Sequence, residues 1–485
     1  MRRVTCPTDF EALRDAIAVR AAGGWTLFEG VTSLAGLATD GVELVGSHGE
    51  VLLRAGDAGR MWRVTGWEER GGELRVEVRG PLGRPGRVLR IAPDGFGPFS
   101  WGDDWFEEAV RHAIERHWGP DSATLTRRGD RIFGSVRTGL RERAAVIAVA
   151  PRCPDRFTDD ALAAGIVLRD RLERATGRAA DLLVFSAPPA VSVLAERLVW
   201  CAPRAAIRLF DVATTTGLAE VRPHDQGGLP QGGRAIWSMA EPPASALVAR
   251  MLAVAPAVLR HSRRAGDARD RITMRGLEIA SARGNVASFG TGKRRARLDD
   301  ASWPAYEAMV RELEHVRSAD APYPQHPLYR AFPERWLVST LRDHVEAIDP
   351  LIDPRCTYEQ VPAFRGQSRD RIDLLAVRRG GRLAVIEVKA AEDRALPLQG
   401  LNYWSRVRWH HLRGEIARRG YFPGIELDPR PPVLYMVAPL FRMHASVSLA
   451  VRLFAPDVEA IVVGLNTNWR RRPVALTRVA ADSRG

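Results

Sequence analysis

The chain has 485 residues, a length that predicts two to four domains rather than one core. Its formal net charge of +13 points to a polyanionic partner such as nucleic acid, although basic composition also occurs in proteins that bind none. No run of 18 uncharged apolar residues occurs, and Asp9 and Glu11 interrupt the N-terminus, so the sequence predicts no membrane segment, no signal peptide and a cytoplasmic location. The four scattered cysteines form no C-x-x-C pair, which argues against a zinc or iron–sulfur site.

The predicted elements begin with a small β-rich α+β domain over residues 1–97. It opens with an amphipathic helix from Phe10 to Ala22, and the Gly-Gly break in MWRVTGWEERGGELRVEVRG then predicts a β-hairpin. Residues 98–221 follow as an α/β domain. Residues 222–325 form a linker, with a short helix at 244–259, a hairpin and a helix from Trp303 to Val316. The proline-rich stretch APYPQHP ends this module.

The remaining domain, residues 326–485, resembles residues 98–221 segment by segment. WFEEAVRHAIE parallels WLVSTLRDHVE, RAAVIAVAP parallels RLAVIEVKA, DLLVFSAP parallels PVLYMVAP, and LAERL parallels LAVRL. The order is kept while the loops lengthen, which an internal duplication would explain. The alternative is that any two α/β units share short apolar runs. If the parallel holds, Glu387 and Lys389 fall opposite Ala148 and Ala150, so the first copy is degenerate.

The C-terminal domain is predicted to be an αβββαβαβ unit. Its helices are expected at 334–347, 398–419 and 446–454, and its strands at 356–361, 371–378, 382–389, 433–437 and 460–465. The domain is basic from His326 onward, with 25 Lys and Arg against 17 Asp and Glu, an excess of 8. Lys389 is one of only two lysines in a chain that otherwise uses arginine, which indicates a requirement for a compact ammonium at this place.

The predicted hairpin IDLLAVRRGGRLAVIEVKA carries three charges among aliphatic residues. Glu387 and Lys389 share one face of their strand because they lie two residues apart. A three-residue loop, 379–381, would pair Asp373 with Glu387, whereas a two-residue Gly-Gly turn would pair it with Val388; we predict the three-residue form or a bulge. Two adjacent carboxylates in a poorly hydrated place repel unless a cation lies between them. Oxygen ligands without Cys or clustered His suit Mg²⁺ or Mn²⁺.

These residues resemble the PD-(D/E)XK nuclease superfamily, which has the restriction-endonuclease-like fold. The likeness rests on Asp373, on the Glu387-Val388-Lys389 triplet, and on Gln399 and Tyr403 in QGLNY, the Q-x-x-x-Y pattern of the RecB-like branch. It covers roughly residues 328–465. Ile372 stands where the family name has proline, a position that commonly varies.

The resemblance implies a metal-dependent nuclease. Asp373 and Glu387 would ligate the metal, together with the Val388 carbonyl and with Glu334 of the preceding helix, directly or through water. Lys389 would position and help to deprotonate the attacking water, or stabilise charge on the phosphorus. Gln399 and Tyr403 would hold the nucleic-acid strand or orient Lys389.

Three arginines complete the expected site. Arg406, Arg408 and Arg413, on or after the same predicted helix, could contact phosphates, a form of binding that is blind to sequence.

The sequence therefore predicts an Mg²⁺- or Mn²⁺-dependent phosphodiester hydrolase, a deoxyribonuclease acting in repair, end processing or defence. The rival from another class is a non-catalytic nucleic-acid-binding or assembly protein on the same fold. RNA is not excluded as the substrate, nor is either endonuclease or exonuclease action. The sequence contains no helicase motor, so unwinding or targeting would come from a protein partner. For the three charges themselves, the competing interpretation is an ordinary salt bridge at a strand end.

Overall fold

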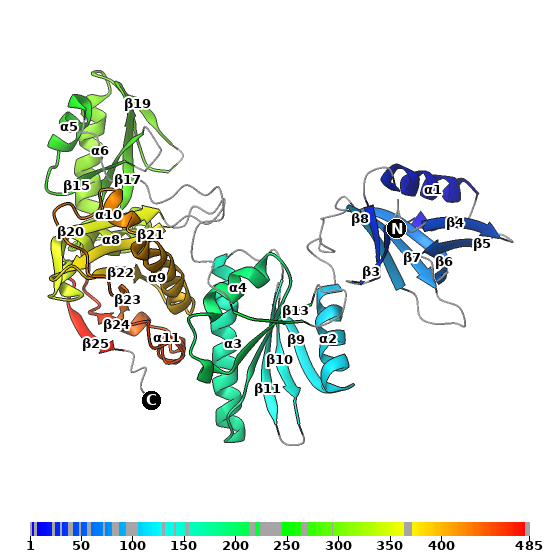
Figure 1. Cartoon of the computed structure of the whole chain (residues 1–485). Coiled ribbons are helices and arrows are strands. Elements are labelled where there is room, and N and C mark those ends of the chain that lie inside the picture. Colours follow the sequence, from blue (N-terminus) through cyan, green and yellow to red (C-terminus); the bar gives the residue numbers. More distant parts are fainter. Residues whose placement is uncertain are drawn as a thin grey trace. The chain divides into compact units, whose positions relative to one another are not determined.

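The computed structural model describes residues 2–3, 7–21, 25–29, 32–36, 42–47, 50–55, 60–70, 73–79, 87–93, 105–128, 131–139, 142–150, 155–212, 219–223, 245–263, 269–292, 294–362 and 371–480. The chain divides into two compact units. The first comprises Met1–Leu198 and Ala206–His224, and the second comprises Val199–Ala205 and Asp225–Gly485. The described residues form mixed α/β structure with four multi-stranded sheets (Figure 1).

The N-terminal sheet of the first unit is antiparallel and is covered by helix α1 (Pro7–Ala21), as expected for a β-rich α+β domain. Its strand order is β3-β2-β8-β7-β6-β5-β4, and β1 pairs with β6. Leu13 and Ile17 of α1 are buried against strand residues such as Leu53 and Val76. The strands are β1 (Arg2–Arg3), β2 (Trp25–Glu29), β3 (Thr32–Gly36), β4 (Val42–Ser47), β5 (Glu50–Ala55), β6 (Arg60–Arg70), β7 (Glu73–Arg79) and β8 (Arg87–Pro93).

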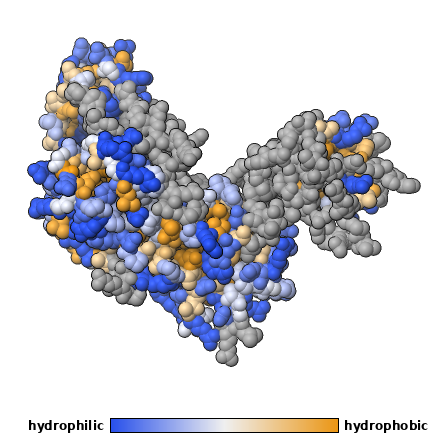
Figure 2. Space-filling view, viewed as in Figure 1, coloured by the Kyte–Doolittle hydropathy of each residue, from blue (hydrophilic) through white to orange (hydrophobic). Residues whose placement is uncertain are grey.

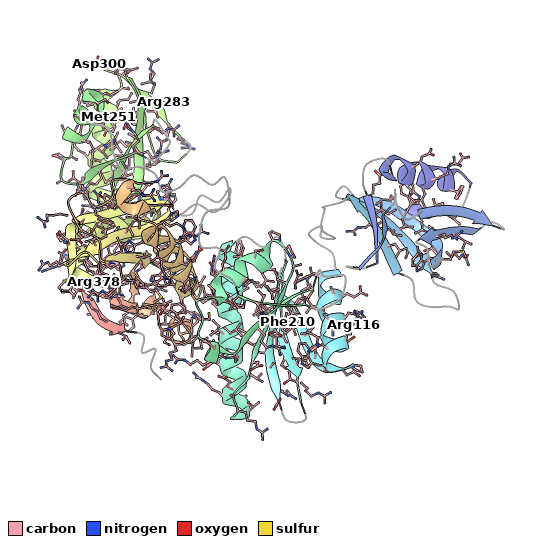
Figure 3. The ribbon with its side chains drawn as sticks, viewed as in Figure 1. Arg116, Phe210, Met251, Arg283, Asp300 and Arg378 are labelled. Carbon is pink, nitrogen blue, oxygen red and sulfur yellow. The ribbon has the colours of Figure 1, made fainter. Side chains whose placement is uncertain are left out.

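The second sheet of the first unit has six strands in the order β14-β13-β12-β11-β10-β9. Its elements are α2 (Trp105–Trp118), β9 (Ala123–Arg128), β10 (Arg131–Arg137), β11 (Arg143–Val149), α3 (Asp155–Thr176), β12 (Leu182–Ser186), α4 (Ala190–Leu198), β13 (Ile207–Asp211) and β14 (Ala219–Val221). Phe210 stacks on Phe185 in its core, and Figure 3 shows Phe210 in the sheet and Arg116 on α2.

The second unit begins with an antiparallel five-stranded meander, β15 to β19, packed with α5 and α6. Helix α6 spans Trp303–Val316, as the sequence predicts. The other elements are α5 (Ala246–Ala253), β15 (Leu259–Arg263), β16 (Asp270–Met274), β17 (Leu277–Arg283), β18 (Val286–Phe289) and β19 (Ala296–Leu298). The helix expected over 244–259 is shorter, because Leu259 already pairs with Met274 in the sheet.

The last sheet has six strands in the order β20-β21-β22-β23-β24-β25. Its elements are α7 (Pro327–Arg330), α8 (Pro333–Asp343), β20 (Ile352–Pro362), β21 (Arg371–Arg378), β22 (Leu383–Val388), α9 (Leu396–Leu412), α10 (Glu415–Arg418), β23 (Val433–Pro439), α11 (Ser446–Val451), β24 (Ala460–Leu465) and β25 (Ala475–Ala480). Strands β21 and β22 are almost wholly buried, because helices lie over both faces of the sheet.

Three predicted boundaries in this domain are corrected. The long helix expected over 398–419 ends at Leu412, because Gly414 adopts a positive φ of 66° that breaks the helix before α10. The first helix ends at Asp343 and is followed by a 3₁₀ turn, Val345–Ala347. Strand β20 begins four residues earlier than expected, and the edge strand β25 was not expected at all.

The second and fourth sheets share one topology. In each, three antiparallel strands are followed by two parallel pairings and a final antiparallel edge strand. In each, a helix precedes the first strand, and further helices connect the third strand to the fourth and the fourth to the fifth. On the face shown in Figure 2, the described surface is mostly hydrophilic, with smaller hydrophobic patches between the hydrophilic residues.

Candidate functional site

The hairpin of β21 and β22 has the register that the sequence predicts. Leu374 pairs with Ile386 and Val377 with Leu383, so the same register continued by one residue sets Asp373 opposite Glu387. The amide of Arg378 donates to the carbonyl of Arg382 at 2.8 Å, which closes a three-residue loop. Both glycines of that loop have positive φ, 95° at Gly380 and 86° at Gly381. The three-residue loop is therefore confirmed.

Side chains of β22 divide between the two faces of the sheet. Ala384, Ile386 and Val388 join the core with Trp336 and Leu341 of α8. The intervening residues, including Glu387, face the side covered by α9, since Glu387 pairs with Met436 and a Cβ on Gly400 of α9 would lie 3.6 Å from the Met436 side chain. The sheet thus places the acid beneath the helix that carries the Q-x-x-x-Y pattern.

Lys389 connects two of the predicted carboxylates. Its Nζ donates to Glu387 Oε1 at 2.9 Å and to Glu334 Oε1 at 3.4 Å. Glu334 lies in the first turn of α8, and its side chain is 43% exposed, whereas those of Lys389 and Glu387 are 9% and 3% exposed. The third acid is Asp373, whose Oδ2 accepts a hydrogen bond from the backbone amide of Val388 at 2.9 Å. The structure therefore brings Glu334, Asp373, Glu387, Val388 and Lys389 together.

The electrostatics of this group reflect burial and an excess of acid. Burial raises the pKa of Asp373, and the charge of Lys389 offsets only part of this rise, so the pKa of the carboxyl group is about 6. Burial and the neighbouring Asp373 raise the pKa of Glu387 well above its ordinary value. Burial lowers the pKa of Lys389, but Glu387, Glu334 and Asp373 raise it further, so the amine stays protonated. One ammonium faces three carboxyl groups.

One buried oxygen in this group has no partner. Glu387 Oε2 is buried and accepts no hydrogen bond in the described part of the chain, an arrangement that costs free energy unless a cation or donor binds there. Asp373 and Glu387 thus offer hard oxygen ligands of the kind that Mg²⁺ and Mn²⁺ prefer. As the residues stand, however, no cluster of three or more His, Cys, Asp or Glu side chains with metal-binding proximity occurs within the described ranges.

Gln399 and Tyr403 lie one turn apart on α9. Gln399 Oε1 is buried and accepts no hydrogen bond from any described group, and Tyr403 is 8% exposed. The connection from β22 through α9 to β23 joins neighbouring parallel strands, a connection that is right-handed in nearly all proteins. A connection of that hand, with Gly400 facing β23, directs both side chains towards β21 and the hairpin that carries Asp373 and Glu387.

The three predicted phosphate-binding arginines have different surroundings. Arg406 is 7% exposed, and its Nε donates to Asn402 Oδ1 at 2.9 Å. The guanidinium of Arg408 lies 4.7 Å from the ring centroid of Trp200 in the segment Val199–Ala205, which belongs to the second unit. Arg413 is exposed and stacks on Trp409 at 3.3 Å. Arg413 is thus the most accessible of the three to a nucleic-acid strand.

Two residues near the site were not expected from the sequence. Gln360 of β20 donates from Nε2 to Asp373 Oδ1 at 3.0 Å, and its φ of 55° is uncommon for a residue other than glycine. Glu359 lies on the opposite face, paired with Leu374, and burial raises its pKa to about 7 although Arg342 opposes the shift. The only sequence signal was the pair of polar residues in an otherwise apolar strand end.

The structure corrects the expected match between Glu387 and Ala148. Ala148 of β11 pairs with Ile132 of β10, and both pack against α2, the helix that corresponds to α8. Glu387 instead faces α9, so Ala148 lies on the other face of its sheet and does not match it. Ala150 follows the strand where Lys389 follows β22. The second sheet therefore has the topology of the fourth, but its described strands β10 and β11 carry no carboxylate on either face.

Comparison of the chain with models of known families, with curated proteins and with solved structures finds no match. Among the described residues, no helix combines the length and the apolar character needed to span a membrane.

Proposed function

We propose that the protein is a metal-dependent nuclease whose active site is the Asp373–Glu387–Lys389 group. The observation that carries the proposal is the pairing of two buried carboxyl groups across one hairpin, with a buried oxygen that has no partner and a single ammonium beside them. Such a group has more acid than its own cation balances, so it favours a divalent ion. The sequence resemblance supplies the reaction class.

In this proposal the residues have distinct roles. Asp373 and Glu387 hold the ion, with the Val388 carbonyl and Glu334 as further ligands. A bound Mg²⁺ or Mn²⁺ polarises a phosphate oxygen and lowers the pKa of its water. The hydrogen bonds from Val388 and Gln360 keep the Asp373 carboxylate oriented. Lys389, released from Glu387 or Glu334, places a charged donor beside the scissile phosphate, and Gln399 and Tyr403 position the strand.

The rival function is a non-catalytic nucleic-acid-binding or assembly protein on the same fold. It is favoured by the ion pairs of Lys389 with Glu387 and Glu334, which satisfy the amine without any metal. A permanent salt bridge of this kind would join the end of β22 to the first turn of α8 and perform no chemistry.

The experiment incubates the full chain with linear duplex DNA, single-stranded DNA and RNA in Mg²⁺, in Mn²⁺ and in a chelator. We expect cleavage that needs the metal and falls by at least about 100-fold in Asp373→Asn, Glu387→Gln and Lys389→Ala. Glu346→Gln, an exposed carboxylate of the same domain, is the matched control and should cut normally. Titration calorimetry of Mn²⁺ gives a second readout, with binding lost in Glu387→Gln. Binding of nucleic acid without metal-dependent cleavage on any substrate would favour the rival.

A further inference from the structure

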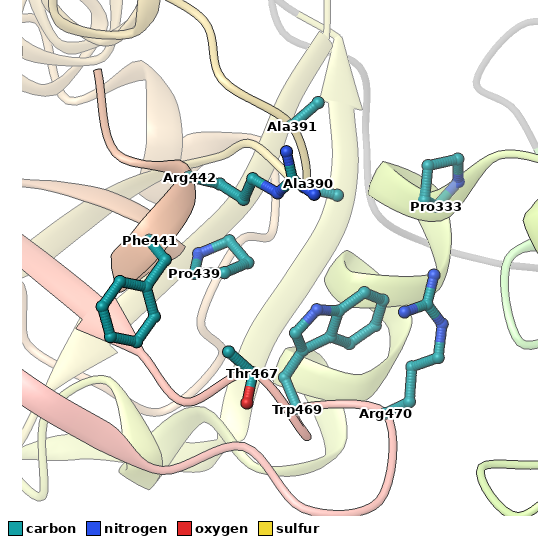
Figure 4. A pocket seen from close by; sticks show the side chains of 9 residues that line it. All are labelled: Pro333, Ala390, Ala391, Pro439, Phe441, Arg442, Thr467, Trp469 and Arg470. Carbon is teal, nitrogen blue, oxygen red and sulfur yellow. The ribbon is translucent and has the colours of Figure 1, made fainter.

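A pocket of about 730 Å³ opens beyond the carboxyl ends of β22, β23 and β24. Ala390 follows β22, Pro439 ends β23, and Trp469 follows β24, so the three strands that run parallel all end at its walls (Figure 4). The crevice beyond the carboxyl ends of parallel strands is where open α/β sheets bind ligands. The volume lies within the range of about 300–1,000 Å³ found for ligand pockets.

Two residues in the pocket wall are neighbours in sequence of residues in the candidate active site. Ala390, in its wall, directly follows Lys389, and Pro333 directly precedes Glu334. Because Lys389 and Glu334 are joined at 3.4 Å, the group that holds the acids and the pocket share two segments of backbone. A polymeric substrate bound at the acids would therefore extend into the pocket with the units that follow the bound one.

The described lining of the pocket contains two arginines and no acidic residue. Arg442 is exposed, and Arg470 is partly buried with its Nε hydrogen-bonded to nothing described. Neither guanidinium forms an ion pair with a carboxylate among residues 2–480 that the structure describes. Arg470 instead lies 4.3 Å from the ring of Trp469 and 5.0 Å from that of Trp336. The charge of Arg470 also helps to lower the pKa of nearby Arg317, after burial, to about 10. This wall therefore favours an anion.

The same pocket presents an aromatic ring to solvent. Phe441 is 80% exposed, the largest exposed fraction among the large hydrophobic residues described. It lies in the 3₁₀ turn Leu440–Arg442, directly before the arginine, and Figure 4 shows it on the same side of the pocket as Arg442, across from Trp469 and Arg470. Exposed aromatic rings beside basic side chains are the arrangement that binds unpaired bases, because every base has a face that stacks.

We propose that this pocket binds an unpaired nucleotide of a single-stranded nucleic acid, with its base on Phe441 and its phosphates paired with Arg442 and Arg470. The inference rests on the proposed function, which supplies nucleic acid as the class of ligand. It adds that the part of the substrate next to the acids, which enters the pocket, is single-stranded. A paired base has both faces covered by its neighbours in the stack and cannot enter a pocket of this kind.

The test measures binding of a fluorescein-labelled oligothymidylate, and of a duplex of the same length, to the full chain in a chelator, by fluorescence anisotropy at two salt concentrations. We expect the single strand to bind at least about 10-fold more tightly than the duplex. Phe441→Ala and Arg442→Ala should each weaken the single strand by about 5- to 20-fold and leave the duplex little changed. Arg472→Ala and Leu412→Ala, an exposed arginine close in sequence and an exposed apolar residue at the end of α9, are the matched controls.

The outcomes separate this inference from the proposed function. If Phe441→Ala and Arg442→Ala bind the single strand as the unaltered protein does, or if Arg472→Ala weakens it equally, the pocket is not the nucleotide site, whatever cleavage shows. If the pocket variants lose binding while no substrate is cut with metal, the pocket assignment stands and the nuclease proposal fails. Circular dichroism spectra of each variant exclude unfolding as the cause.

Discussion

Asp373 links the stability of the protein to pH. Its folded pKa of about 6 lies above its ordinary value of 3.8, so the native state binds a proton more tightly than the unfolded chain. The stabilisation that this proton gives is complete below about pH 3.8 and is lost as pH rises through about 6. Asp373→Asn should therefore raise the free energy of unfolding at pH 8 by about 2–3 kcal/mol and change it little at pH 4.

Urea unfolding of both forms from pH 4 to pH 8 in a chelator checks this expectation. Asp353→Asn is the control, because hydrogen bonds from Arg355 lower the pKa of Asp353 to about 2, so its effect is constant from pH 6 to pH 8 and begins to fall only near its ordinary pKa of 3.8. An Asp373→Asn protein that is less stable than the parent at pH 8 would contradict the electrostatic account.

Lys389 is expected to stabilise the metal-free site by holding acids that otherwise repel. Lys389→Met removes the ammonium bonded to Glu387 and Glu334 and leaves a buried carboxylate uncompensated. We expect the free energy of unfolding to fall by about 3 kcal/mol at pH 8, and by less at pH 5, where the raised pKa values of Asp373 and Glu387 leave these acids protonated.

Adding Glu387→Gln to Lys389→Met should restore much of that loss, because it removes the unpaired charge. The measurement is a double-mutant cycle by chemical unfolding, with Arg418→Met, an exposed cation of α10, expected to change stability by no more than about 0.5 kcal/mol. A coupling of zero between positions 387 and 389 would show that the ion pair does not form in solution.

The turn between β21 and β22 sets the register of the site, and its two glycines provide a matched pair. Both have positive φ, but a Cβ at Gly381 would lie 2.1 Å from the carbonyl oxygen of Glu426, whereas a Cβ at Gly380 meets nothing within 4 Å. Gly380→Ala should cost about 1 kcal/mol through backbone strain alone. Gly381→Ala should cost about 3 kcal/mol or more, because the turn must also move away from Glu426.

Thermal unfolding measures the two costs, and cleavage assays should show a larger loss for Gly381→Ala, since a shifted turn changes which residues oppose Asp373 and Glu387. Equal effects of the two substitutions would mean that the contact with Glu426 does not constrain the turn.

The elements of the hairpin could be predicted because their signals are local. A Gly-Gly break between two apolar runs and the two-residue spacing of Glu387 and Lys389 fix the turn and the shared face from neighbouring residues alone. Gln360 could not be found this way, because its bond to Asp373 depends on how β20 pairs with β21 across residues 363–370. Strand β25 was missed because its residues are almost all exposed, so its sequence lacks the alternation of apolar and polar residues that marks a half-buried strand. The basic pocket was missed because its lining residues follow different strands, so only the folded sheet brings Phe441 and Arg470 to opposite walls of one pocket.

At the scale of the whole molecule, the two six-stranded α/β sheets form an internal comparison. They share strand order, strand directions and helix positions, and we infer that one ancestral unit was duplicated. Strands β10 and β11 carry no carboxylate, although the core between their sheet and α2 is similar to the core beneath α8. Losing a buried, repelling acid pair stabilises a fold, so the change fits a copy kept as a scaffold.

This comparison gives a prediction with its control inside one chain. If the fourth sheet holds a divalent ion, Mn²⁺ should slow hydrogen exchange of the backbone amides in β21, β22 and the first turn of α8, because the ion joins the segments that carry Asp373, Glu387 and Glu334. The amides of β10 and β11 should exchange at the same rate with and without Mn²⁺, since Ile132 and Ala148 offer no ligand. With metal at about 100 times its dissociation constant, the protection should amount to about 2.7 kcal/mol, and Glu387→Gln should remove it. Protection of both hairpins alike would mean that the ion binds diffusely to the protein, whereas protection of neither would leave Lys389 as the permanent partner of the acids. Since exchange is read peptide by peptide, the two hairpins report under identical solution conditions, and the difference between them isolates the effect of the acid pair.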